Sequence, residues 1–236
     1  MCTVTYIPID NKDFIFTSNR DENPNRKAIA PMTYVENGVK MVYPKDELAG
    51  GTWIGISEKK RLVCLLNGGF EKHKHNAFYK MSRGVIVRKL LKAKNLLSTI
   101  YEFNFENIEP FTIVLIDWNT KLSVYELVWD GIKKHVKELK NEPKIWSSST
   151  LYDAQMKQDR ANWFNDWLEE GDLNQEEVMR FHQDTERGTQ ETALKMKRPF
   201  VETVSITSVK KEKEHVTLHY LDFVHDKKTS AMLSTI

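Results

Sequence analysis

The sequence lacks most of the features that would assign it to a specialised class of protein. It has two cysteines in 236 residues, Cys2 and Cys64, which are too few for a disulfide framework and favour a reducing compartment. No apolar run approaches the roughly 20 residues that a membrane-spanning helix needs. The first residues lack the basic start and apolar centre of a signal peptide. We therefore expect a soluble, cytoplasmic protein with no membrane span.

An excess of charge of either sign is also missing. The 35 Lys and Arg residues stand against 33 Asp and Glu residues, which gives a net charge of +2. This balance provides no electrostatic reason to expect a nucleic acid or an anionic membrane as partner. The sequence contains no Walker loop, Rossmann fingerprint or HExxH helix, and we predict no cofactor and no metal site.

Strand-like segments occupy both ends of the chain. Residues 2–7 and 13–18 are rich in β-branched and aromatic side chains, and the polar stretch between them predicts a hairpin. Further strands are expected at 51–57, 61–67, 111–117, 121–129, 132–136, 200–207 and 214–223.

Helical spacing of apolar residues is confined to the middle of the chain, at 79–100, 153–170 and 173–182. No internal repeat or low-complexity linker divides the sequence. Because strands from both ends would complete the sheets, we expect one α+β domain over residues 1–236.

Cys2 is the sharpest chemical feature, since removal of Met1 would make it the N-terminal residue. A free thiol has a pKa of about 8.5 and an α-amine a pKa of about 7.7–8.0. Both groups would then belong to one residue, and the amine can act as general base for the thiol. The alternative is that Cys2 is a small hydrophobe at a strand end.

A polar tetrad, Asn-Arg-Asp-Glu at 19–22, directly follows the strand-like run that ends at residue 18. A solvated turn is one interpretation. In a hairpin, however, the end of the second strand would lie beside the start of the first, which would bring Arg20 and Asp21 near Cys2. A guanidinium there would lower the pKa of the thiol, and a carboxylate would hold the amine.

Four segments resemble the NRDE family, also called the Transport and Golgi organisation 2 family: MCTVTYIP, SNRDENPNR, AGGTWIGIS and RLVCLLNGGF. The tetrad gives that family its name. The resemblance is specific over residues 1–70 and looser beyond them. It implies a fold like that of the N-terminal-nucleophile hydrolases, an α+β sandwich of four layers with two stacked antiparallel sheets between helices.

The resemblance extends to the choloylglycine hydrolases and the penicillin V amidases, and it implies roles for four residues. Cys2 matches their nucleophile, Arg20 the residue that stabilises its thiolate, and Asp21 the carboxylate that orients the amine. Asn67, at the end of LVCLLN, matches an oxyanion-hole amide or is simply a strand-end turn residue.

Three more residues are candidates for substrate binding: Asn19, Glu22 and Trp53. For Trp53 we favour packing between the sheets over stacking on a substrate.

Two positions depart from the amidase pattern. Ser149 stands where many relatives carry an asparagine, and Val204 stands where they carry an arginine. Loss of one oxyanion donor typically costs about 3 kcal/mol of transition-state stabilisation. Arg198 is a candidate to compensate for the missing arginine.

Two hypotheses follow for function. The first is hydrolysis of a non-peptide amide or related acyl bond of a small hydrophobic molecule. The second is a non-catalytic binding or trafficking protein on the same fold, because the resemblance also implies haem or an acyl compound as ligand. His73 and His75 have a spacing that can hold metal or haem, although their polar, lysine-rich surroundings favour a solvated loop.

Overall fold

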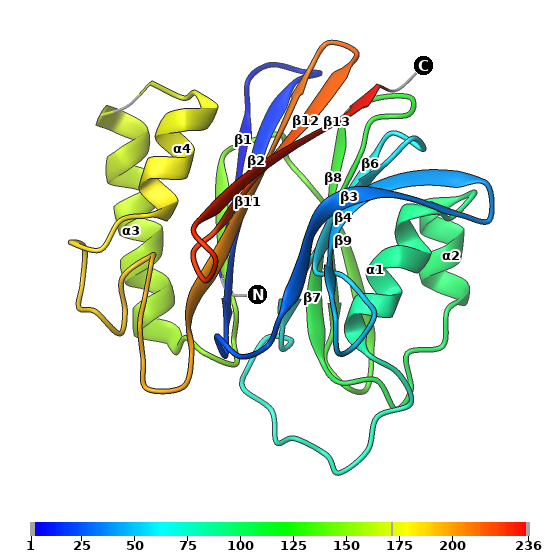
Figure 1. Cartoon of the computed structure of the whole chain (residues 1–236). Helices are drawn as coiled ribbons and strands as arrows, with labels where there is room; N and C mark the ends of the chain where they lie inside the picture. The colour runs from blue at the N-terminus through cyan, green and yellow to red at the C-terminus, as the bar shows by residue number, and fades with distance from the viewer. Residues whose placement is uncertain (1–2, 171, 235–236) are drawn as a thin grey trace.

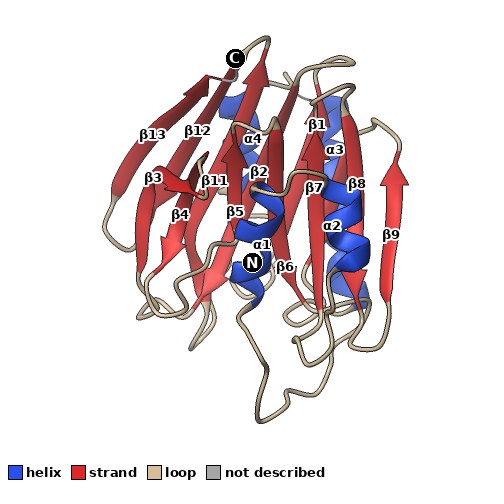
Figure 2. Ribbon diagram, turned by 90° about the vertical axis from the view of Figure 1, so that its right-hand side faces the viewer, coloured by secondary structure: helices blue, strands red, loops and turns tan. Residues whose placement is uncertain are grey.

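Two antiparallel sheets stack between two pairs of helices in the computed structural model (Figure 1). The structure describes residues 3–170 and 172–234. One outer layer holds α3 (Ala154–Glu170) and α4 (Gln175–His182), and the other holds α1 (Arg83–Leu91) and α2 (Leu96–Glu102). Figure 2 shows α1 and α2 lying across the outer face of the second sheet. The expectation of a four-layer α+β sandwich is confirmed.

The first sheet has six strands and joins both ends of the chain. Its order is β10 (Lys144–Ser147), β1 (Thr3–Pro8), β2 (Phe14–Glu22), β11 (Glu202–Glu212), β12 (His215–Asp222) and β13 (Lys227–Ser234). The expected hairpin is present, with Thr3 opposite Asn19 and Pro8 opposite Phe14. The C-terminal strand β11 pairs with the other edge of β2, so β2 lies inside the sheet.

The second sheet has seven strands in chain order. They are β3 (Ala28–Glu36), β4 (Val39–Asp46), β5 (Ile54–Ser57), β6 (Arg61–Asn67), β7 (Phe111–Asp117), β8 (Ser123–Trp129) and β9 (Lys134–Leu139). Each strand pairs antiparallel with the next. The long connection between β6 and β7 contains α1 and α2.

Alternating side chains on the strands build the layers. Phe14 and Phe16 of β2 join Ile54 and Leu62 in the apolar core between the sheets. Ile15, which lies between the two phenylalanines, faces the other way and packs against Phe164 and other side chains of the α3–α4 layer. This period of two allows β2 to hold two layers together.

Several expectations about single elements were wrong. The strand expected at 13–18 continues to Glu22, so the tetrad belongs to β2 and does not follow it. The helix expected at 79–100 is two helices, α1 and α2, separated at Lys92–Asn95. Strands β3, β4, β10 and β13 were not expected. Most residues of β3 are at least partly exposed, and β13 is polar, so neither has the apolar signal of a strand.

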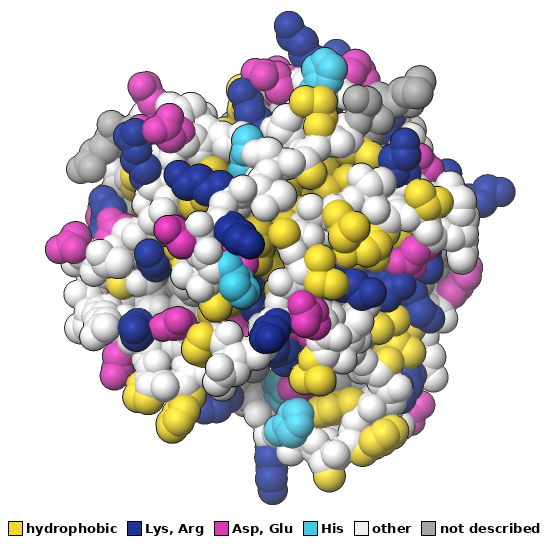
Figure 3. All heavy atoms as spheres, in the orientation of Figure 1, with side chains coloured by type: hydrophobic (Ala, Val, Ile, Leu, Met, Phe, Trp, Pro, Cys, Tyr) yellow, Lys and Arg dark blue, Asp and Glu magenta, His cyan; other side chains and the backbone are white. Residues whose placement is uncertain are grey.

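Charges of both signs are interspersed on the face of the molecule that Figure 3 shows, in keeping with the net charge of +2. Among the helices of residues 3–170 and 172–234, none is long and apolar enough to cross a membrane.

Helix α1 approaches the loop before β5 very closely. A Cβ on Gly51 would lie 2.6 Å from the carbonyl carbon of Gly84, and one on Gly84 would lie 2.9 Å from the amide nitrogen of Thr52. Both distances are shorter than a van der Waals contact. The start of α1 can therefore rest against this loop only if both positions are glycine.

We expect Gly51→Ala to lower the free energy of unfolding by about 1–3 kcal/mol, because the added methyl group must displace the Gly84 backbone. Ser82→Ala is the matched control, since Ser82 precedes α1, is exposed and makes no capping hydrogen bond through its side chain. Its cost should stay within about 0.5 kcal/mol. Urea denaturation measures both, and equal losses would contradict the close-contact explanation.

Candidate active site

The strand geometry of β2 divides the tetrad between two faces of the first sheet. Arg20 lies on the face between the sheets, where its guanidinium carbon is 4.6 Å from the centre of the Trp53 ring. Asn19 and Asp21 lie on the face covered by helices, because consecutive side chains of a strand alternate. The tetrad therefore contributes to two separate polar networks.

Arg20 is almost fully buried, with 4% of its surface exposed, and its guanidinium is held in place by hydrogen bonds. Its Nη2 donates to Oδ2 of Asp46 over 3.3 Å, and its Nη1 donates to the carbonyl oxygen of Arg26 over 3.1 Å. The same Asp46 oxygen accepts a hydrogen bond from Nε of Arg26 over 2.8 Å. Asp46 therefore joins two guanidinium groups.

A small pocket opens beside Arg20, and we call it the arginine pocket. It has a cavity volume of about 80 Å³ and is lined by Arg20, Glu22, Arg26, Asp46, Ala49, Gly51, Thr52, Trp53, Leu65, Asn67, Ser82, Arg83 and Gly84. Ligand sites usually measure about 300–1,000 Å³, so this pocket fits one polar group of a ligand and not an entire hydrophobic molecule.

Four of the candidate residues from the sequence come together in this pocket: Arg20, Glu22, Trp53 and Asn67. The pocket also contains Arg26, Asp46 and Arg83, which sequence reasoning missed. Arg26 lies within the segment SNRDENPNR and could have been found there. Asp46 and Arg83 come from β4 and α1, and no local pattern connects them to the tetrad.

A second network surrounds Asp21 on the helix-covered face. Its Oδ2 accepts a hydrogen bond from the Tyr152 hydroxyl and its Oδ1 one from Oγ1 of Thr203, each over 2.6 Å. The guanidinium of Arg160 stacks on the Tyr152 ring at 3.6 Å and donates to Oγ1 of Thr3. The hydrogen bonds from Tyr152 and Thr203 hold the Asp21 carboxylate on the helix-covered face of β2.

Asn19 is fully buried and bonded away from the arginine pocket. Its amide nitrogen donates to the carbonyl oxygens of His182 and Leu194 over 3.0 and 2.8 Å. Its Oδ1 must then accept from Nδ1 of His182 at 2.6 Å, which leaves Nε2 to accept from the Thr5 hydroxyl at 2.7 Å. A neutral imidazole makes both contacts, and burial disfavours the charged form. Asn19 therefore ties the end of α4 to β2.

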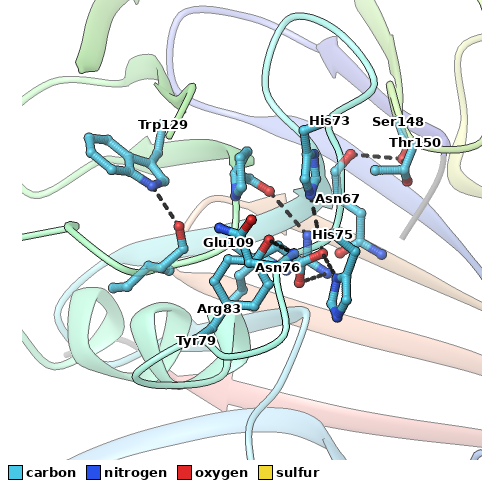
Figure 4. A network of polar contacts seen from close by, with 12 residues as sticks. Asn67, His73, His75, Asn76, Tyr79, Arg83, Glu109, Trp129, Ser148 and Thr150 are labelled. Atoms are coloured by element: carbon cyan, nitrogen blue, oxygen red, sulfur yellow. Dashed lines mark hydrogen bonds and ion pairs between the residues drawn. The ribbon is translucent and has the colours of Figure 1, made fainter. Parts of the chain in front are cut away.

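The loop before α1 is tied to Glu109, as Figure 4 shows. One oxygen of Glu109 is 3.3 Å from Nε2 of His73 and 3.2 Å from Nδ1 of His75, and the other is 2.9 Å from Nη2 of Arg83. No group of three or more His, Cys, Asp or Glu side chains in the described parts of the chain could hold a metal ion. Glu109 instead orients Arg83, which lines the arginine pocket.

Ser149 and Val204, the two positions that depart from the amidase pattern, are both among the described residues. The Ser149 hydroxyl donates to the carbonyl oxygen of Gly69 over 2.6 Å, and Val204 is buried. Arg198, the proposed substitute, donates to the carbonyl oxygens of Glu191 and Leu151 and is absent from the residues that line the arginine pocket.

Cys2 lies outside the described residues. Thr3 is the first residue that the structure describes, and it pairs with Asn19 of β2 and with Ser147 of β10.

The stacked antiparallel sheets between helical layers define the class: the fold is that of the N-terminal-nucleophile hydrolases. The chain belongs to the Transport and Golgi organisation 2 family, whose sequence model matches residues 1–226.

Solved structures with this fold include an acid amidase, a variant of a bile acid hydrolase and an acylase. The Caenorhabditis elegans ortholog of N-acylethanolamine-hydrolyzing acid amidase has a TM-score of 0.58 and 14% identity, over 88% of this chain and 92% of that one. An arginine-to-leucine variant of conjugated bile acid hydrolase from Clostridium perfringens has a TM-score of 0.56 and 10% identity, over 98% and 92%.

The third, penicillin V acylase from Agrobacterium tumefaciens, has a TM-score of 0.52 and 8% identity, over 99% of this chain and 86% of that one. Among curated proteins, none matches the sequence. At these identities the structural likeness establishes the fold alone.

The buried imidazole of His182 makes stability depend on pH. Burial, with a contribution from the charge of Arg160, lowers the pKa of His182 to about 3. Between about pH 6.5 and 3 the unfolded chain therefore binds a proton at His182 that the folded protein excludes. Stability is highest above pH 6.5 and falls as the pH is lowered, by at most about 1.4 kcal/mol per unit.

We expect His182→Gln to remove this slope, so that the loss of stability between pH 7 and pH 5 is smaller by about 2 kcal/mol than in the unaltered protein. Urea denaturation at the two pH values measures it. His215→Gln changes an exposed histidine and serves as the control, which should keep the original slope. The same slope in His182→Gln as in the unaltered protein would contradict a neutral, buried His182.

Proposed function

We propose that this protein is an N-terminal cysteine hydrolase that cleaves a non-peptide amide or a related acyl bond of a small hydrophobic molecule. The main support is the position of Arg20 at the end of β2, held by Asp46 and Trp53 in a pocket that Asn67 also lines. Thr3, which follows Cys2 in the sequence, pairs with the residue before Arg20. The Cys2 thiol and Arg20 are therefore proposed to work on one substrate.

In the proposed reaction, removal of Met1 exposes the α-amine of Cys2. The amine takes the thiol proton, and the thiolate attacks the acyl carbon to form a C–S bond. Arg20 would favour the thiolate and Asn67 would donate to the oxygen that becomes negative. The C–N bond then breaks as the amine product takes the proton, and water hydrolyses the thioester.

Asp21 is proposed to orient the α-amine from the helix-covered face of the sheet. Tyr152 and Thr203 fix its carboxylate at both oxygens, which suits a positioning role. Arg20 and Asp21 would thus act on Cys2 from opposite faces of β2.

A non-catalytic protein that binds or traffics haem or a lipid remains the second candidate. Two positions that depart from the amidase pattern favour it. The Ser149 hydroxyl already donates to the carbonyl oxygen of Gly69, and Val204 carries no charge, so neither side chain would assist catalysis. For haem, His73 and His75 are the proposed ligands, and both would have to leave Glu109.

We also propose that residues 1–236 work as one domain in the cytoplasm. Support for one domain comes from the apolar core between the sheets, to which both sheets contribute. Support for the compartment comes from the low number of cysteines.

Protein that has lost Met1 should hydrolyse an acyl amide from a panel of N-acyl amino acids, N-acyl amines and lactams, with a rate that rises as the amine loses its proton near pH 7.7–8.0. Cys2→Ala should abolish turnover. Arg20→Met should lower kcat by about 100-fold, while Asp46 keeps its ion pair with Arg26.

Arg61→Met is the matched control for Arg20→Met. Arg61 is an equally buried arginine, paired with Asp117, at the other end of the sandwich. It should change stability without changing kcat. Full activity in Cys2→Ala, or no hydrolysis of any substrate by protein with a free Cys2 amine, would favour the binding protein.

The two cysteines should differ strongly in reactivity. Burial raises the pKa of the Cys64 thiol to about 12, so few molecules carry its reactive thiolate at neutral pH. In the folded, processed protein we expect iodoacetamide to label Cys2 and leave Cys64 unmodified, as peptide mass spectrometry would measure. Labelling of both at the same rate before unfolding would remove the main support for a nucleophilic Cys2.

A further inference from the structure

Three arginines from three segments of the chain converge on the arginine pocket. Arg20 comes from β2, Arg26 from the loop after β2, and Arg83 from the first position of α1. The lining contains two acidic residues, Glu22 and Asp46, so the lining by itself has a positive formal charge. Glu22 pairs with Arg26 over 3.5 Å, and Glu109, which is outside the lining, pairs with Arg83. The convergence of these segments is not required by the sandwich itself, whose layers are held by apolar contacts.

The three guanidinium groups are held rigidly and keep unused donors. Asp46 binds both Arg20 and Arg26, and Glu109 and the Pro110 carbonyl oxygen hold Arg83 over 2.9 and 3.1 Å. A guanidinium has five N–H groups. Among the described residues, each of the three arginines leaves some of these groups without a partner.

Arg83 is the most deeply placed cation on the α1 side of the pocket. Burial lowers the pKa of its guanidinium, while the charges of Glu109 and Glu22 favour the charged form and that of Arg26 opposes it. A ligand anion next to Arg83 would stabilise this charge further. Arg26 is more accessible, with 37% of its side chain exposed.

The other walls of the pocket also offer donors. The close contact of Gly51 and Gly84 brings the start of α1 against the pocket. The first turn of α1 has no acidic residue, and the Ser82 side chain caps none of its amides. The amides at the start of α1 add positive potential to that of the arginines.

The size of the pocket decides which part of a ligand enters it. A volume of about 80 Å³ suits a compact anion such as a carboxylate and is too small for an acyl chain. Guanidinium groups bind a carboxylate through two parallel hydrogen bonds, which an alcohol cannot match.

We propose that the arginine pocket binds a carboxylate of the substrate through Arg26 and Arg83, so that the preferred substrate class is an N-acyl amino acid and not a neutral N-acyl amine. This inference rests on the proposed function for the reaction, and its binding part can be tested separately. In the reaction, water adds across the amide bond to give a fatty acid and a free amino acid, and the bound carboxylate is unchanged.

The test compares N-dodecanoylglycine with N-dodecanoylethanolamine, which share the chain and the amide and differ in a carboxylate against an alcohol. Calorimetry with full-length Cys2→Ala protein, below the concentrations at which the ligands form micelles, measures binding without turnover. We expect the glycine conjugate to bind about tenfold more tightly, with a preference that weakens as salt is raised.

Arg83→Met/Glu109→Gln removes the arginine together with the charge of its partly buried partner and should reduce the preference to near one. Arg26→Met tests the exposed arginine with little risk to the fold and should reduce the preference as well. Arg88→Met is the matched control: it lies on the same helix, pairs with Glu36 and does not line the pocket. It should keep the full preference.

Equal affinity for the two ligands, no binding of either, or a preference that survives loss of Arg26 and of Arg83 would overturn the inference. Hydrolysis is then assayed with unaltered, processed protein. Selective binding without hydrolysis would refute the proposed enzyme and leave the carboxylate site standing. Hydrolysis of both conjugates at equal kcat/KM would support the enzyme and refute the site.

Discussion

The period of two along β2 is the constraint on which the rest of the structure depends. The strand pairs on both edges, with β1 and with β11, so its register is fixed and each of its side chains has an assigned face. Phe14 and Phe16 set the core between the sheets, and Ile15 sets the contact with the helices. The polar tetrad continues the same alternation and therefore supplies two networks from four consecutive residues.

The cost of burying charge explains why each network is so fully bonded. A buried ion is costly unless opposite charge or several hydrogen bonds surround it. Arg20 has Asp46, a carbonyl oxygen and the Trp53 ring, whereas Asp21 has two hydroxyl donors. A pair of apolar side chains would fill the same space at a lower cost in free energy. The charges at the end of β2 therefore add little to stability by themselves, and each depends on the partners that surround it.

The sequence was sufficient to predict the layers and part of the site. The strands and site residues that it did not predict were missed for physical reasons. The hairpin, β6, β7 and the helices of the middle region carry clear apolar periodicity, which predicted one α+β domain. The four-layer sandwich was predicted from the resemblance of the first 70 residues to the NRDE family. Strands with polar or exposed side chains, such as β3 and β13, were missed because pairing partners, and not composition, make them strands. Arg20, Glu22, Trp53 and Asn67 were found. Asp46 and Arg83 were not, since only the tertiary fold brings β4 and α1 to β2.

Val204 stands where the amidase pattern has an arginine, and in this chain a further arginine reaches the arginine pocket from the other side of the sandwich. Val204 lies in β11 of the first sheet and Ser149 follows β10, and neither contributes a charge. Arg83, by contrast, reaches the arginine pocket from α1, which packs on the second sheet, and Glu109 holds it there. The stacked sheets allow this arrangement, because a pocket between them can receive side chains from either side. A chain with this fold can therefore keep the arginine at the end of β2 while a further cation enters the same pocket from α1.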